Sequence, residues 1–165
     1  CKELLIMLKK SSTNIKIRTI NFQGTEKQTF DFHPNEEIEC SVILSLPQKY
    51  LYEPNSAIMK AGAFKIIAKK YNLNKLHPNS HLYTSEKLVA NFPGRTFQII
   101  GLDALKKKVI RKIIPNAKAN ISTRNFPLSV QEVKKKLEIK DGGHIYIFAT
   151  TLMNNKHMLI TCNKA

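Results

Sequence analysis

Residues 95–165 carry the pattern that most constrains the fold, a regular alternation of extended and helical segments. Four segments have the apolar spacing or apolar runs of strands: residues 96–102, 118–123, 144–151 and 157–162. Asp103 precedes one helical pattern as a candidate N-cap, and Ser129 with Glu132 forms a capping box for another. The order is β, α, β, α, β, β. Because each helix must cover one face of the sheet, we predict a two-layer sandwich with both helices on one side.

The same stretch carries most of the positive charge. The 165 residues have a formal net charge of +15, and residues 95–165 hold 14 Lys and Arg against 4 Asp and Glu. A folded basic surface favours a polyanionic partner, with nucleic acid as the first candidate. A solvated face that only aids solubility is the alternative. Phosphates would bind such a surface through charge and counterion release, with little reading of bases.

The candidate nucleic-acid-binding residues lie on the two predicted helices and around the strand between them. They are Lys106, Lys107, Lys108, Arg111, Lys112, Lys118, Arg124, Phe126, Lys134, Lys135 and Lys136. Arg124 could meet a phosphate while an exposed Phe126 stacks on a base. A buried Phe126 that packs beside the helix cap is an equal alternative.

Residues 1–94 are organised differently. Residues 14–22 and 27–33 alternate around a turn and predict a hairpin, and residues 40–46 predict a third extended run. The apolar opening segment, residues 1–10, has no initiator Met, so we expect a piece of a longer protein whose remainder covers an opening helix; a processed or poorly ordered start is the alternative. One helix is predicted over residues 56–71, with Asn55 or Ser56 as its cap, and a short one after residue 84.

The chemistry-bearing residues give weak signals for catalysis or metal binding. His77 and His81 have a spacing seen in zinc sites, but Pro78 disrupts a helical face and no cysteine pair is near, so a turn or interface role is favoured. Gly142 and Gly143 precede a strand without a following helix, which favours a tight turn over a phosphate cradle. We predict no catalytic residue and no metal site in this chain.

Composition sets the broad class. A hydrophobic content of 42% is typical of a globular protein with one ordinary domain or two small ones. No run approaches the roughly 18 apolar residues that a membrane span requires, and no signal peptide is evident. We expect a cytoplasmic protein that has no membrane partner and whose three cysteines are reduced.

Five ordered strings carry a resemblance to a known family. They are YLYEPNSAIMKAGAFK at 50–65, LHPNSHLYTS at 76–85, NFPGR at 91–95, ANISTRNFPLSV at 119–130 and KDGGHIYIFATT at 140–151. Together they resemble the C-terminal part of a bacterial family of class I S-adenosylmethionine-dependent methyltransferases. In that family a Rossmann-type catalytic domain precedes a ferredoxin-like segment and a THUMP-like domain.

The resemblance implies an α+β organisation in three parts. Residues 1–46 would be the closing helix and antiparallel hairpin of the methyltransferase sheet, 47–94 a small α/β ferredoxin-like segment, and 95–165 the THUMP-like βαβαββ sandwich. A methyltransferase of this class needs a Gly-rich turn after its first strand and an acidic residue after its second, and neither is present. S-adenosylmethionine is therefore expected for the full-length parent and not for this chain, which should be inactive alone.

Two functional hypotheses follow. The first is an RNA-binding and substrate-positioning region, with RNA, or alternatively DNA, and the N-terminal catalytic domain of the same protein as partners. Tyr52 and Glu53 would line the seam with that domain and help to place a substrate base, although a structural role at the helix start explains both residues adequately. The second hypothesis is a structural domain that docks on the catalytic half without binding nucleic acid. An independent enzyme has only scattered polar residues to support it.

Overall fold

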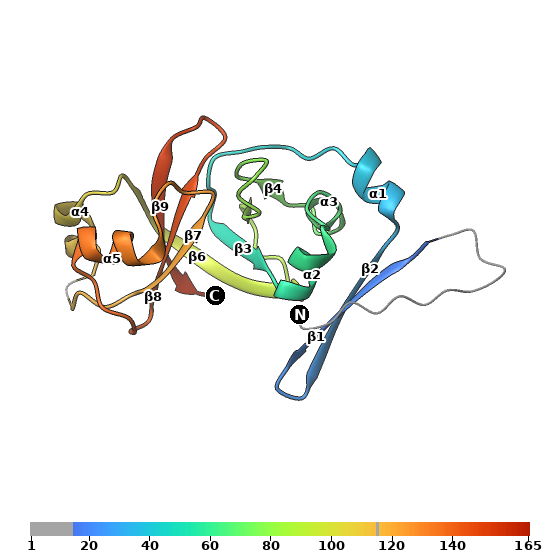
Figure 1. The fold of residues 1–165 in the computed structure, drawn as a ribbon, viewed down its shortest axis with the longest axis horizontal. Helices are drawn as coiled ribbons and strands as arrows, with labels where there is room; N and C mark the ends of the chain where they lie inside the picture. Colours follow the sequence, from blue (N-terminus) through green and yellow to red (C-terminus); the bar gives the residue numbers. More distant parts are fainter. Residues whose placement is uncertain (1–14, 115) are drawn as a thin grey trace.

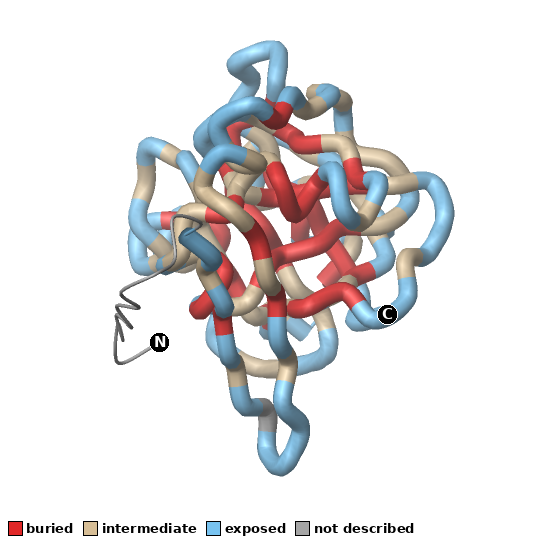
Figure 2. The backbone as a smooth tube through the Cα atoms, turned by 90° about the vertical axis from the view of Figure 1, so that its right-hand side faces the viewer, coloured by how far each residue is buried: buried red, intermediate tan, exposed pale blue. Residues whose placement is uncertain are grey.

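The computed structural model describes residues 15–114 and 116–165, which form a two-stranded hairpin and a seven-stranded mixed sheet with helices packed around them (Figure 1). Figure 2 shows buried backbone in the middle of the molecule and the exposed hairpin tip projecting from it. The predicted α+β class agrees with this arrangement.

The hairpin consists of β1 (Ile17–Gln23) and β2 (Glu26–Phe32), which pair antiparallel across a turn at Gly24. Gly24 has a φ of 63°, a left-handed conformation that glycine adopts without strain. Thr19, Phe30 and Phe32 are buried. The predicted hairpin is confirmed, whereas the opening helix predicted for residues 1–10 lies outside the described residues.

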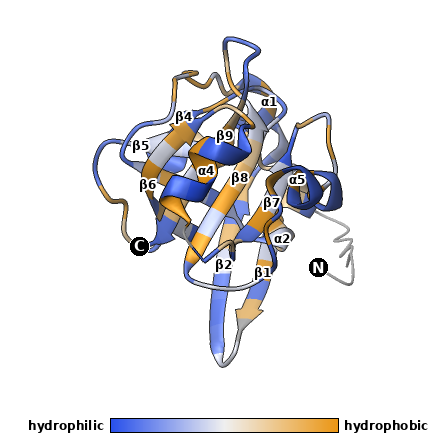
Figure 3. Cartoon of the chain, turned by 90° about the vertical axis from the view of Figure 1, so that its left-hand side faces the viewer, coloured by the Kyte–Doolittle hydropathy of each residue, from blue (hydrophilic) through white to orange (hydrophobic). Residues whose placement is uncertain are grey.

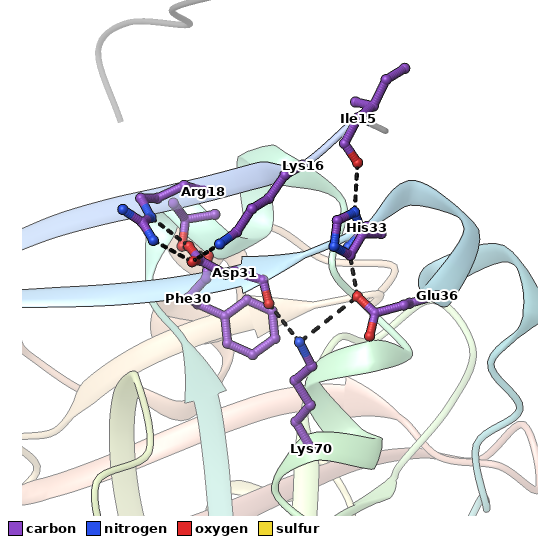
Figure 4. A network of polar contacts seen from close by, with 9 residues as sticks. Ile15, Lys16, Arg18, Phe30, Asp31, His33, Glu36 and Lys70 are labelled. Atoms are coloured by element: carbon purple, nitrogen blue, oxygen red, sulfur yellow. Dashed lines mark hydrogen bonds and ion pairs between the residues drawn. The ribbon is translucent and has the colours of Figure 1, made fainter. Parts of the chain in front are cut away.

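Polar contacts connect the hairpin to its surroundings (Figure 4). The Asp31 carboxylate accepts hydrogen bonds from Arg18 at 2.6 and 2.8 Å and forms an ion pair with Lys16 at 2.8 Å. Lys70 donates to the Asp31 carbonyl oxygen at 2.6 Å, so the hairpin is attached to α3 (Ile66–Lys70). The contacts of Arg18 and Lys16 hold the two strands of the hairpin together, and the contact of Lys70 positions the hairpin against α3.

The segment after the hairpin differs from the prediction. Helix α1 (Pro34–Glu39) begins at a proline, and the Glu36 side chain accepts a hydrogen bond from the His33 backbone at 2.6 Å. We predicted no helix between the hairpin and residue 40, so this helix was missed. Residues 40–46 do not form the predicted strand, because pairing in this segment is limited to a single parallel bridge between Leu44 and Lys75.

The large sheet has the strand order β4-β5-β3-β6-β9-β8-β7. Its strands are β3 (Tyr50–Pro54), β4 (Asn74–Lys75), β5 (Tyr83–Ser85), β6 (Gly94–Asp103), β7 (Asn120–Arg124), β8 (Ile145–Thr151) and β9 (His157–Lys164). Neighbours pair antiparallel, except that β7 and β8 are parallel. The long strand β6 pairs with both β3 and β9, so one continuous sheet joins the segments before and after residue 94.

The helix predicted over residues 56–71 is two helices, α2 (Ser56–Ala61) and α3. Gly62 has a φ of 75° and its N–H bonds back to the end of α2, which ends that helix. Asn55 caps α2 as predicted, because its side chain accepts a hydrogen bond from Ile58 N at 3.1 Å. The short helix predicted after residue 84 is wrong, since β5 and irregular turns occupy that segment.

The βαβαββ order of residues 95–165 is confirmed, with α4 (Lys107–Ile113) and α5 (Val130–Leu137) as its helices. Ile110 on α4 and Val133 on α5 share one apolar cluster with Ile121 and Ile147 of the sheet, so both helices cover the same face (Figure 3). The capping box of Ser129 and Glu132 is present. Asp103 does not cap α4, because it is the last residue of β6.

Within the described residues, no helix has the length and apolar character needed to cross a membrane. Cys40 and Cys162 are buried free thiols. Burial raises the pKa of Cys162 to about 12, because the thiolate would lose its hydration. Cys162 is therefore a poor nucleophile in the folded protein.

Candidate nucleic-acid interface

The start of α4 and the end of α5 lie together, and ion pairs hold them there. Glu138, directly after α5, accepts a hydrogen bond from Arg111 at 2.8 Å and forms an ion pair with Lys107. Glu138 has a φ of 53°, which places it at the left-handed C-cap of α5. These pairs lower the pKa of the Glu138 carboxyl, with the hydrogen bond from Lys107 as the main cause. The lysines at the two helix ends are thereby brought to one end of the helical layer.

This arrangement concentrates positive charge. We define the helix-end cluster as the three lysines at the start of α4, Arg111 in the last turn of α4 and the three lysines in the last turn of α5. Its members are Lys106, Lys107, Lys108, Arg111, Lys134, Lys135 and Lys136. Glu138 and Asp141 are its carboxylate partners, with Lys134 at 2.7 Å from Asp141. Among the described residues no ion pair involves Lys106, Lys108, Lys135 or Lys136, and the cluster keeps a large net positive charge.

The helix dipole favours the lysines at the end of α5 but not those at the start of α4. Lysines in the last turn of α5 lie near the negative end of its dipole, where cations stabilise a helix. Lys107 and Lys108 lie in the first turn of α4, at its positive end, and no acidic residue accompanies them there. Three consecutive lysines at a helix start oppose the dipole, so stability of α4 does not explain them.

The remaining predicted residues are dispersed. Lys112 is exposed on α4, and Lys118 lies beside Lys140 through a parallel bridge at the start of β7. Phe126 is half-buried, packs against the helical core and meets His157 edge-to-face at 5.7 Å between ring centroids. Its contact with the core supports the packing alternative, while its partial exposure leaves one part of the ring accessible.

Arg124 lies on the other face of the sheet. In the parallel register Ile121 is opposite Ile147, whose side chain packs under the helices, whereas Arg124 is opposite Thr150, three residues further along β8. Because side chains alternate along a strand, Arg124 points away from α4 and α5. The structure therefore separates Arg124 from the helix-end cluster.

Arg124 instead binds the carboxylate of Glu53, which is the centre of a second polar cluster. Arg124 donates to Glu53 Oε1 at 2.8 Å, and Arg95 donates from Nε to Glu53 Oε2 at 2.8 Å. The Glu53 side chain is 5% exposed, whereas those of Arg95 and Arg124 are 49% and 41% exposed. One buried carboxylate thus orients two half-exposed guanidinium groups, and the cluster keeps a net charge of one positive unit.

The pair of Glu53 and Arg124 requires a strongly curved sheet. Glu53 lies on β3 and Arg124 on β7, and the strand order places four strand spacings between them. In a flat sheet that separation is roughly 19 Å at about 4.8 Å per strand, which is too far for a direct contact. The sheet therefore curls around the apolar cluster that contains Leu51, Phe97 and Phe148.

A cavity of about 600 Å³ opens beside this polar cluster. Its lining comes from the hairpin, the end of β3, the cap and body of α2, the start of β6 and the end of β7. The lining residues used below are Asn21, Gln28, Glu53, Asn55, Arg95 and Arg124. The cavity therefore lies where the hairpin and both halves of the large sheet meet.

Tyr52 has a different role from the predicted one. It is fully buried, and its hydroxyl is 2.9 Å from Ser85 Oγ, donates to Lys87 O at 3.2 Å and accepts from Val89 N at 2.9 Å. Its hydroxyl therefore holds the loop after β5, and the side chain cannot reach a substrate or a docked domain. Glu53 does line an accessible cavity, together with Asn55 and Ser56 at the start of α2.

His77 and His81 contact other residues of the chain. His77 Nδ1 accepts a hydrogen bond from Asn79 N at 3.0 Å and lies 3.0 Å from Asn125 Nδ2. His81 stacks on Phe64 with 3.8 Å between ring centroids. Burial lowers the pKa of His81 to about 4, with smaller contributions from the charges of Lys75 and Arg124. Among the described residues no three potential metal ligands of the His, Cys, Asp and Glu types gather.

Gly142 and Gly143 do not form the Gly-rich turn before a helix that a class I methyltransferase uses to admit S-adenosylmethionine. Gly142 and Gly143 have φ values of 113° and 79° in the turn that leads into β8, and no helix follows them. Gly143 is close to Lys118, whose carbonyl oxygen would be 3.2 Å from an added Cβ. The tight-turn interpretation of this pair agrees with the structure.

Sequence reasoning missed Arg95, Asn21 and Gln28 as candidate site residues. Arg95 lies directly opposite Glu53 in the pairing of β3 with β6, so recognising two paired strands would have indicated the contact. Asn21 and Gln28 are opposite each other in the hairpin, and their pairing was readable from the turn. No local signal in the sequence places the hairpin beside Arg95.

The fold and the cavity define the class: an α+β protein in which a small α/β unit and a βαβαββ unit share one curled sheet. Comparison with known families agrees with this division. Residues 50–93 match a family described as a ferredoxin-like domain, and residues 94–164 match one described as THUMP domain-like. The chain therefore carries a ferredoxin-like and a THUMP-like domain, as the ordered strings predicted.

One solved structure is similar to this chain over most of its length. It is the crystal structure of a "putative methyltransferase" from Porphyromonas gingivalis W83, with a TM-score of 0.85 and 41% sequence identity. The match covers 91% of this chain and 38% of the Porphyromonas gingivalis protein, so this chain spans less than half the length of that protein. No curated protein sequence matches significantly.

Proposed function

We propose that this chain is the RNA-binding and substrate-positioning region of an S-adenosylmethionine-dependent methyltransferase whose catalytic domain lies outside the chain. The helix-end cluster carries this proposal. It gathers cations from two helices at one end of the THUMP-like unit, and its lysines at the start of α4 oppose the helix dipole. Phosphates of an RNA strand are suitable partners for such a surface.

The comparisons support the assignment to a methyltransferase. The Porphyromonas gingivalis protein bears that description, and its greater length leaves room for a catalytic domain. That domain would hold the cofactor and perform methyl transfer. The hairpin and the cavity beside it would face the catalytic domain as a seam, with Glu53 as the predicted residue in it. We expect the protein to act in the cytoplasm, where such a substrate is found.

RNA binding across a range of salt concentrations tests the proposal. A quadruple variant replaces the exposed lysines of the cluster that form no ion pair with another described residue, Lys106→Gln, Lys108→Gln, Lys135→Gln and Lys136→Gln. The matched control replaces four exposed lysines elsewhere, Lys27→Gln, Lys69→Gln, Lys87→Gln and Lys164→Gln. Both variants lose the same formal charge, so any difference in their RNA binding is due to where the replaced lysines lie.

For a single-stranded RNA, each lost phosphate contact reduces the slope of log K against log salt by about 0.7, so four contacts reduce it by roughly 3. We expect that reduction in the helix-end variant and a much smaller one in the control. Equal losses in the two variants, or a flat salt response of the unmodified chain, would contradict phosphate recognition by the helix-end cluster.

The second candidate function is docking on the catalytic domain without nucleic acid. It is favoured by the ion pairs that already engage Lys107, Arg111, Lys134 and Arg124. A charge reversal at Lys106, Lys107, Arg111 and Lys134 separates the candidates in the full-length protein. Methyl transfer to RNA that survives this reversal would support docking, and its loss together with RNA binding would support the proposed function.

A further inference from the structure

We infer that the cavity beside Glu53 is a subsite for a single nucleotide of the RNA strand, with Arg95 and Arg124 on its phosphate and the amides of Gln28 and Asn21 on its base. This inference rests on the proposed function and adds a second site, on the opposite face of the sheet from the helix-end cluster. The cavity volume of about 600 Å³ lies in the range of small-ligand sites.

The phosphate end follows from the hydrogen bonds of the two arginines. Arg95 uses Nε and Nη2 on the Glu53 carboxylate, and Arg124 uses Nη2. A guanidinium has five N–H donors, so most donors of the pair are not engaged by Glu53. Arg95 also lies over the Phe97 ring at 5.5 Å from its centroid, which restricts its orientation. Two oriented, half-exposed guanidinium groups with a net positive charge suit a phosphate.

The base end follows from a chain of hydrogen bonds that begins at the cap of α2. Ile58 N can only donate, so the Asn55 atom that it contacts is Oδ1, and Asn55 Nδ2 is the donor toward Gln28 at 3.1 Å. The Gln28 atom facing Asn55 is then Oε1. Asn21 Nδ2 donates to the same oxygen at 3.2 Å.

These hydrogen bonds determine which donors and acceptors of Gln28 and Asn21 remain available to a ligand. Gln28 keeps its two Nε2 donors and Asn21 keeps its Oδ1 acceptor, and no hydrogen bond within the described residues uses them. Both residues line the cavity. Adjacent donors and acceptors on side-chain amides match the edge of a nucleobase, which presents the same groups in complementary order. A base in the cavity would satisfy oriented groups that no described residue pairs.

Glu53 is a positioning residue in this subsite, because both of its oxygens are engaged by the arginines. Gly94 supports the same geometry. An added Cβ at Gly94 would lie 2.8 Å from Pro54 Cα and closer still to the Glu53 carbonyl oxygen. The close backbone approach of β3 and β6 at this point places Arg95 directly across from Glu53.

The test measures the affinity of this chain for fluorescent homopolymer RNAs of the four bases and of one length, at one salt concentration. We expect unequal affinities, and we expect Gln28→Ala to remove the difference while leaving the salt slope unchanged. Thr29→Ala is the matched control, because Thr29 is exposed on the neighbouring position of β2 and does not line the cavity. Equal affinities for all four homopolymers would overturn the subsite and leave the proposed function intact.

A second variant tests the phosphate end. Arg95→Ala should weaken binding about tenfold, the typical consequence of losing a charge-assisted hydrogen bond. Its control is Arg18→Ala, another half-exposed arginine bound to a carboxylate but absent from the cavity lining. Equal effects of the two variants would overturn the inference. So would a nucleoside monophosphate that binds as tightly as the oligonucleotide, because the site would then serve a free nucleotide.

Discussion

Replacing Glu53 by Gln tests the physical account of the curled sheet, because one carboxylate connects β3 to both β6 and β7. The substitution keeps the shape of the side chain and removes its charge. The amide retains one oxygen that can accept from one arginine, but its NH₂ group meets the donors of the other. We therefore expect Glu53→Gln to lower the free energy of unfolding.

The magnitude follows from the exposure of the three groups. Removing one partner of a fully buried pair costs about 3–5 kcal/mol, and an exposed pair contributes about 0–1 kcal/mol. Glu53 is 5% exposed, but its arginine partners are 49% and 41% exposed and recover part of their hydration when the carboxylate is lost. An intermediate cost of about 2–3 kcal/mol is expected.

Urea unfolding followed by circular dichroism measures this cost, and Glu138→Gln provides the matched control. Glu138 also bridges two cations, Lys107 and Arg111, but its side chain is 57% exposed. The control should be much less destabilised. A loss of stability in Glu53→Gln that is no larger than the loss in Glu138→Gln would refute the argument that burial makes this cluster important for the fold.

Two further predictions concern stability near the same site. Gly94→Ala should destabilise the fold by about 1–3 kcal/mol, because its Cβ would overlap the end of β3, and Gly101→Ala, which meets a flexible Ile113 side chain at 3.2 Å, should cost less in the same urea assay. His81 remains neutral in the fold down to about pH 4, whereas its ordinary pKa is 6.5, so the unfolded chain binds the extra proton first and stability should fall as the pH falls between these values. His81→Asn should reduce that pH dependence in thermal unfolding, and an unchanged profile in this variant would contradict the assignment.

Local sequence patterns predicted the elements whose cause is local. The βαβαββ order, the capping box of Ser129 and the cap at Asn55 each depend on residues a few positions apart. The break at Gly62 was also local, but the apolar periodicity continued across it and suggested one helix. Asp103 shows that a residue type favoured at N-caps does not by itself locate a helix start, because Asp103 is the last residue of β6.

The candidate cavity could not be predicted in the same way. Glu53 and Arg124 are separated by 71 positions along the chain, and their contact depends on the curl of a sheet with five strands between and including β3 and β7. Sequence reasoning selected both residues, but assigned them to different roles on different surfaces. A strand pattern alone does not encode sheet curvature, which depends on the packing of the whole apolar cluster beneath it.

The positions of the two basic sites constrain how one RNA strand could contact both. The helix-end cluster lies on the face of the sheet covered by α4 and α5, and Arg124 lies on the opposite face. β7 is an edge strand, with β8 as its partner in the sheet, so the short route between the faces passes around β7. Lys118 and Lys140 lie together at the start of this edge. Replacing both by Gln should therefore uncouple the sites, so that the base preference that depends on Gln28 weakens in a long RNA while the helix-end contribution to the salt slope remains.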